Sequence, residues 1–161
     1  MKTALLLCLA LSAIAPSLAA AENKLGGPWT FGSIVVEQAW AQATEDAAAA
    51  YLVIHNKSSA DDYLLAVDSP VAKSAAIHDT VLTDGVAITE PVPGGLDMPS
   101  HAEVIMQPGG LRIVLTGLPT GVKPGDTLPV EMVFRDAGAF QFEVPIFPPK
   151  AKVAKHQDHG P

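Results

Sequence analysis

Short apolar and β-branched runs alternate with turn residues along most of this chain, which is the pattern of β-strands in a half-buried sheet. Several runs alternate apolar and polar positions, so that one face of each strand would be buried. Strands recurring at this spacing with Gly, Pro and Asp turns between them indicate an all-β sandwich. The predicted strands are Ser33 to Trp40, Ala49 to Asn56, Asp62 to Ser69, Ala72 to Val81, Val86 to Val92, Glu103 to Gln107, Leu111 to Thr116, Leu128 to Phe134 and Ala139 to Phe147.

Turn chemistry sets the connections between these strands. Asp84-Gly85 lies between two of the runs, and this dipeptide is a strong signal for a tight hairpin. The Ala-rich stretch from Ala43 to Ala50 could begin as a helical turn, but charged residues interrupt it. We therefore interpret this stretch as a loop that leads into a strand.

The first 21 residues are typical of a secretory signal peptide, with Lys2 followed by an apolar segment from Ala4 to Ile14 and a cleavage site of small residues. We expect export to the periplasm. Lipidation is not expected at Cys8, because it follows Leu7 rather than a small residue and lies very close to the start. Residues 22–149 are predicted to form one domain, and residues 150–161 a flexible tail that contains His156 and His159.

Composition excludes several kinds of site. Cys8 is the only cysteine, so the mature chain would lack disulfides, cysteine-based zinc sites, thiol nucleophiles and blue-copper centres. The formal net charge is −7, which argues against a nucleic-acid partner and an anionic membrane surface. No phosphate-binding glycine loop, nucleophile elbow or zinc-protease helix motif is present, so we do not expect an enzyme.

Several short sequence motifs occur in a fixed order between Ser33 and Ile146. They are Ala39-Trp40, the segment AAYLVIHN, His78 before the Asp-Gly turn, Met98-Pro99, and the turn QPGGL. In this layout the chain resembles the PCuAC family of periplasmic copper chaperones. The resemblance implies a cupredoxin-like, immunoglobulin-like β-sandwich with Greek-key connections. It also implies a copper site built from His and Met side chains.

The chain departs from the family at most of its copper ligands. The family pattern is a His, a Met after ten residues, and a His-x-Met pair after the Pro-Gly-Gly turn. His78 is kept, but Thr89, Arg112 and Val114 stand at the other three positions. Val114 has no donor atom, a Thr hydroxyl suits a soft cation poorly, and a guanidinium stays protonated and repels metal. We therefore expect the inherited Cu(I) site to be badly weakened.

Replacement ligands can be suggested from the sequence. His78 is the expected primary ligand and His101 the second, in a site for Cu(II) or Cu(I). Met98 is a less certain third ligand, and His156 and His159 in the tail are weak candidates. Asp97 and Glu90 could neutralise Arg112. His55, Met106, Met132, Trp40 and Phe134 are interpreted as structural residues.

Two functions follow from these expectations. The first is an exported metallochaperone that holds one copper ion and delivers it to a cuproenzyme or another copper-handling protein, which could be a membrane protein. The alternative is a metal-free β-sandwich interaction module, in which Arg112 forms a salt bridge and fills the former metal site.

Overall fold

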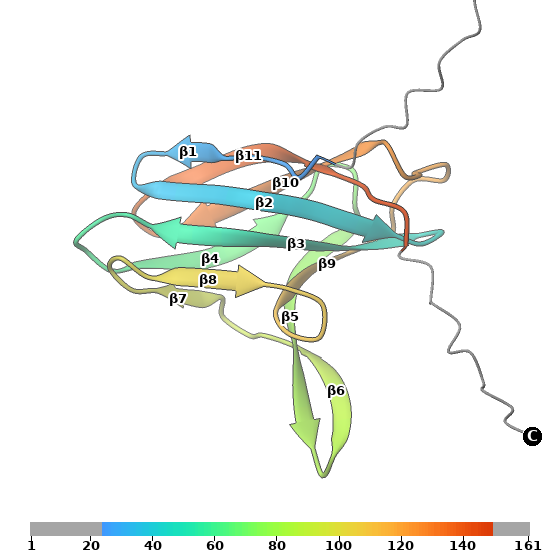
Figure 1. Ribbon diagram of the computed structural model, residues 1–161, viewed down its shortest axis with the longest axis horizontal. Helices are drawn as coiled ribbons and strands as arrows, with labels where there is room; N and C mark the ends of the chain where they lie inside the picture. Colours follow the sequence, from blue (N-terminus) through green and yellow to red (C-terminus); the bar gives the residue numbers. More distant parts are fainter. Residues whose placement is uncertain (1–23, 150–161) are drawn as a thin grey trace, which may run out of the picture.

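Two antiparallel β-sheets pack against each other in the computed structural model, which describes residues 24–149 (Figure 1). The expected all-β sandwich is therefore confirmed. The predicted signal peptide and the predicted tail lie outside the described residues. Within residues 24–149, no helix has the length and apolar character needed to cross a membrane.

The larger sheet has seven strands, in the order β1-β2-β3-β9-β5-β6, with β8 also paired to β3. Its strands are β1 (Trp29–Phe31), β2 (Ile34–Ala43), β3 (Ala47–Asn56), β5 (Ser74–Thr83), β6 (Val86–Pro91), β8 (Glu103–Met106) and β9 (Arg112–Thr116).

The smaller sheet has four strands in the order β11-β10-β4-β7. They are β4 (Asp62–Asp68), β7 (Leu96–Met98), β10 (Thr127–Phe134) and β11 (Gly138–Pro145). The chain passes from one sheet to the other between β3 and β4, β4 and β5, β6 and β7, β7 and β8, and β9 and β10. Such crossings between sheets are those expected of a Greek-key sandwich.

The core lies between the sheets because each strand turns alternate side chains inward. In β9, Ile113 and Leu115 are fully buried, whereas Arg112 and Val114 lie on the opposite face. The predicted core positions Met106, Met132 and Phe134 are also buried. The largest fully buried side chains are those of Ile34, Leu52, Ile54, Leu64, Met98, Ile113, Leu115, Leu128, Met132 and Ile146.

The Ala-rich stretch differs from its prediction. It was expected to be a loop leading into a strand, but β2 continues to Ala43 and β3 begins at Ala47, so only residues 44–46 form the turn. Thr44 closes this turn, because its hydroxyl and its N–H both donate to the carbonyl of Ala47. Pairing across the sheet therefore overrides the weak strand preference of alanine.

The hairpin of β5 and β6 projects beyond the rest of the larger sheet (Figure 1). β9 pairs with β5 only from Ser74 to His78, so the remainder of β5 pairs with β6 alone. Asp84 and Gly85 both have positive φ, as a two-residue hairpin turn of the predicted kind requires. Leu82 at the tip is 77% exposed.

Candidate functional site

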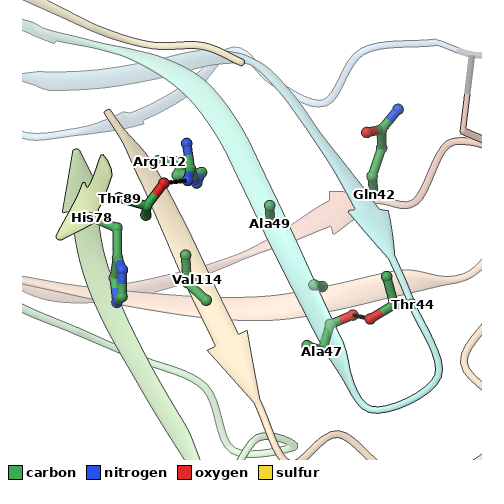
Figure 2. A pocket seen from close by; sticks show the side chains of 9 residues that line it. Gln42, Thr44, Ala47, Ala49, His78, Thr89, Arg112 and Val114 are labelled. Carbon is green, nitrogen blue, oxygen red and sulfur yellow. Dashed lines mark hydrogen bonds between the residues drawn. The ribbon is translucent and has the colours of Figure 1, made fainter. Parts of the chain in front are cut away.

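A hollow of about 400 Å³ lies on the outer face of the larger sheet (Figure 2). We call it the Arg112 hollow. Its floor is formed by small apolar side chains at neighbouring positions of β3 and β9, where Ala49 pairs with Val114. Alanines make the hollow possible, because no side chain extends beyond Cβ there. The lining residues are Gln42, Thr44, Ala47, Ala48, Ala49, His78, Thr89, Arg112 and Val114.

Strand register brings the polar residues together at one end of the hollow. His78 on β5 pairs with Arg112 on β9, and Thr80 on β5 pairs with Thr89 on β6. The side chains two positions apart on β5 share a face, so His78 and Thr80 both lie on the outer face. The four family ligand positions (His78, Thr89, Arg112 and Val114) therefore line one hollow, as the resemblance implied.

Arg112 is held by neutral hydrogen-bond acceptors. Its Nη1 donates to the Thr80 hydroxyl at 2.9 Å, and its Nη2 donates to the Thr89 hydroxyl at 2.6 Å (Figure 2 draws the Thr89 bond). A longer contact of 3.4 Å joins Nη1 to the carbonyl of Gly110. The guanidinium thus occupies the place where the family has a second histidine.

Neither carboxylate expected to neutralise Arg112 does so. Asp97 lies on β7 in the other sheet, where it pairs with Tyr63, and Glu90 pairs with Asp79 across the hairpin. Within residues 24–149, Arg112 forms no ion pair. The salt bridge that was expected in the alternative interpretation is therefore absent from the described part of the chain.

The structure does not bring His101 to His78. His101 follows β7 in a turn, and its backbone N–H donates to the carbonyl of Ser58, just beyond the far end of β3. The Arg112 hollow is lined by the other end of β3, from Ala47. His78 pairs with Arg112, and Ile113 pairs with Ala50, so both ligand positions lie level with the middle of β3. The five residues from there to the end of β3 at Asn56 span about 16 Å at the usual rise, so the predicted two-histidine site is not formed in this structure.

Met98 is 0% exposed and belongs to the core rather than to the hollow. Its carbonyl accepts a hydrogen bond from the Asn56 side-chain amide at 2.9 Å, which joins the two sheets. The tail residues His156 and His159 lie outside the described residues. Across residues 24–149, no three His, Cys, Asp or Glu side chains are grouped so that they could hold a metal ion.

His55 is the most elaborately bonded histidine of the described chain. It is 14% exposed, and its ring lies between two carboxylates, with Nε2 3.0 Å from Glu37 and Nδ1 3.3 Å from Glu103. These residues belong to β2, β3 and β8, so the contacts tie three neighbouring strands together. The interpretation of His55 as a structural residue agrees with this geometry.

Two features of the hollow were missed in the sequence. Thr80 was not singled out, although it lies two residues after His78 and therefore shares its face. The role of Ala47 and Ala49 as a floor was also missed, because the Ala-rich stretch was interpreted as a loop. Thr80 could have been found by applying the two-residue period of a strand from His78 onward. The alanine floor could have been found by extending the predicted strand that ends at Asn56 back to Ala47.

A family comparison decides where the chain belongs. The family described as "Putative lipoprotein LpqE-like" matches residues 34–146. This chain belongs to the LpqE-like family. The family is related to PCuAC, and the suspected resemblance is confirmed. A relative from Leifsonia xyli subsp. xyli, described as "Putative lipoprotein Lxx21020", is 26% identical over 114 residues, which cover 70% of this chain and 69% of the relative.

Solved structures agree with this assignment. The apo PCuAC domain from PmoF1 is 26% identical, with a TM-score of 0.62, and covers 75% of this LpqE-like chain and 98% of its own. The Cu(I) form of DR1885 from Deinococcus radiodurans is 25% identical, with a TM-score of 0.54, over 68% of this chain and 74% of its own. None of these descriptions names an enzyme.

Proposed function

We propose that this LpqE-like protein is an exported copper-handling protein that holds copper through His78 and passes it to a recipient cuproenzyme or another copper-handling protein. The main support is the position of His78. It lines an open hollow on the outer face of a sandwich similar to the Cu(I)-bound domain of DR1885. The periplasm is the proposed location, and a membrane-bound recipient is compatible with that location.

The ligand set proposed here differs from that of the family. Thr89, Arg112 and Val114 offer no soft donor, so His78 is the anchor. His156 and His159 remain candidates as further ligands, and a recipient protein could supply others during transfer. His101 would act only as a separate surface ligand, because it lies far from the hollow. A carrier with few ligands of its own suits transfer, since incoming groups can replace them one at a time.

Copper titration of the metal-stripped mature protein tests this proposal, at both oxidation states and against a competing chelator. We expect His78→Ala to weaken copper binding by at least ~10-fold, because it removes the anchoring imidazole. His101→Ala should change the affinity less than about twofold, and His156→Ala with His159→Ala measures the contribution of the tail. Met98→Leu is the matched control, because it fills the same core volume without a thioether.

Copper uptake that is saturable and unchanged in His78→Ala would contradict the proposed anchor. A large loss in His101→Ala alone would restore His101 as the main ligand and contradict the assignment to the hollow.

A second function is favoured by one specific observation. The Arg112 guanidinium donates to both Thr80 and Thr89, so a cation and its hydrogen bonds already fill part of the inherited site. This arrangement supports a metal-free interaction module. Absence of saturable binding at either oxidation state, in a protein with a cooperative thermal transition, would favour the module over the copper carrier.

A further inference from the structure

We propose that the Arg112 hollow binds a small carboxylate with an apolar body, so that the inherited cation site has become an anion site. This inference concerns the metal-free protein and does not depend on copper binding.

The first argument is the hydrogen bonding of the guanidinium. Arginine carries five N–H donors, and Arg112 uses its two terminal nitrogens for three bonds within the described chain. The Thr80 and Thr89 hydroxyl oxygens are 3.4 Å apart, so together they face the end of the guanidinium that carries both terminal nitrogens. Within residues 24–149, Nε–H and the second N–H of Nη2 have no acceptor. A carboxylate can accept from Nε–H and Nη2–H as a bidentate pair.

The second argument is local charge. The protein is acidic overall, with a net charge of −7, yet none of the Asp and Glu residues between 24 and 149 lines the hollow. Charges more than about 10 Å away are largely screened at moderate salt, whereas a contact at hydrogen-bond distance is not. The nearest carboxylates along the hairpin, Asp79 and Glu90, occupy the alternate positions and so belong to its opposite face. Arg112 is therefore the charged group in direct contact with the hollow, and it favours an anion.

The third argument is the shape and chemistry of the rest of the hollow. A volume of about 400 Å³ lies within the range of small-molecule sites. Its floor is made of Ala47, Ala49 and Val114, which would contact an apolar body (Figure 2). Gln42 and Thr44 lie on the far side of this floor from Arg112 (Figure 2). The ligand class is thus a carboxylate at one end with a short apolar body that lies over the alanines.

Such a carboxylate has two chemical sources, a free small molecule or the C-terminus of a peptide. We favour the free acid, because the hollow is bounded by side chains at both ends. The test includes a probe for each source.

The experiment titrates the metal-stripped protein with phenylacetate, while two-dimensional NMR follows the backbone amides of β3 and β9 and the Arg112 Nε–H. Phenylacetamide is the neutral control of the same shape, and an acetylated Ala-Phe peptide with a free or an amidated C-terminus probes the second source. We expect saturable shifts with phenylacetate and none with phenylacetamide. Stronger binding of the free-acid peptide than of phenylacetate would overturn our choice of source but not the anion site.

Three variants locate the binding. Arg112→Gln should weaken phenylacetate binding by at least ~10-fold, since it removes the charge and the bidentate edge. Lys57→Gln removes one positive charge from an exposed position outside the hollow and should leave binding unchanged. Ala49→Leu fills the floor and should also abolish binding while Arg112 stays in place. The proposal is overturned if no probe gives saturable shifts, if phenylacetamide binds equally well, or if either Arg112→Gln or Ala49→Leu binds phenylacetate like the wild type.

Discussion

At the scale of single residues, three side chains determine what the inherited site can do. Thr89, Arg112 and Val114 occupy the positions of family ligands and replace soft donors by a hydroxyl, a fixed cation and a methyl surface. Arg112 then donates to the hydroxyls of Thr80 and Thr89, while its Nε–H and one Nη2–H have no acceptor within residues 24–149. The change is therefore more than a loss of ligands, because a hydrogen-bonded group with a positive charge has taken their place.

Restoring the family residues should restore a soft metal site. We predict that the triple variant Thr89→Met, Arg112→His and Val114→Met raises Cu(I) affinity at least ~100-fold, or about 2.7 kcal/mol, over the wild type. Competition with a chromogenic Cu(I) chelator measures this gain. Thr44→Met, which adds a thioether at the other side of the hollow, is the control. An unchanged affinity in the triple variant would mean that His78 is not positioned for a metal.

Much of this site, but not all of it, could be predicted from the sequence. The clustering of His78, Thr89, Arg112 and Val114 could be predicted, because the family motif and the period of a strand both place them on one face. The separation of His101 from His78 could not, since it depends on which strands pair across the sheet. The hydrogen-bond partners of Arg112 could not be predicted either. Whether the guanidinium bonds to Thr80 and Thr89 or to Asp97 and Glu90 depends on how close each side chain lies in the folded structure.

At the scale of elements, long alternating runs were predictable and very short strands were not. The hairpin around Asp84-Gly85 follows from local turn chemistry. β1 and β7 have only three residues each, so neither shows a period that a sequence could reveal. β7 exists because Leu96 to Met98 pair with β4.

Gly95 makes the pairing of β7 with β4 possible. It has φ of 101°, and a Cβ at this position would collide with the backbone carbonyl of Leu64. We predict that Gly95→Ala lowers the free energy of unfolding by at least ~2 kcal/mol, because the left-handed conformation and the clash add together. Urea unfolding measures the loss.

Gly109 supplies the matched control. It also has positive φ, of 86°, but a Cβ there would meet nothing within 4 Å. Gly109→Ala should therefore cost only the backbone strain, about 1 kcal/mol. Equal losses in the two variants would show that the contact with Leu64 does not limit the approach of the strands.

At the scale of the whole molecule, the fold is held by its core and by a few buried polar contacts. Asp62 is one such contact, at the start of β4. Its carboxylate accepts hydrogen bonds from the backbone N–H groups of Tyr63, Asp136 and Ala137 at 2.7, 2.9 and 3.0 Å. It thereby fixes the turn between β10 and β11 to the neighbouring strand.

The protonation of Asp62 should make stability depend on pH. Burial by itself would raise the pKa of Asp62, but the three backbone N–H groups and the charge of Arg135 outweigh burial and lower it. A carboxyl group whose pKa is lower in the folded state stabilises the fold above its unfolded pKa, near 3.9, and loses that contribution as the pH falls through the folded value. We predict that Asp62→Ala costs about 1–3 kcal/mol at pH 7 and progressively less below about pH 4.

Urea unfolding at pH 7, 5 and 3 checks this prediction. Asp68→Ala is the control, because Asp68 accepts a single hydrogen bond, from the N–H of Ser69, and is exposed. A loss in Asp62→Ala that stays constant from pH 7 to pH 3 would show that the charge of Asp62 does not matter to stability.

The pairing of Arg112 with Thr89 has a mechanical consequence for the projecting hairpin. In the described part of the chain, β5 beyond His78 pairs with β6 alone. The hydrogen bonds of Arg112 to Thr80 and Thr89 therefore connect β9 to both strands of the hairpin. Without these two hydrogen bonds, the part of the hairpin beyond His78 would be held by the pairing of β5 with β6 alone. A carboxylate bound to Nε–H and the free Nη2–H would leave both threonine bonds in place, so the hollow can be filled while the hairpin stays held.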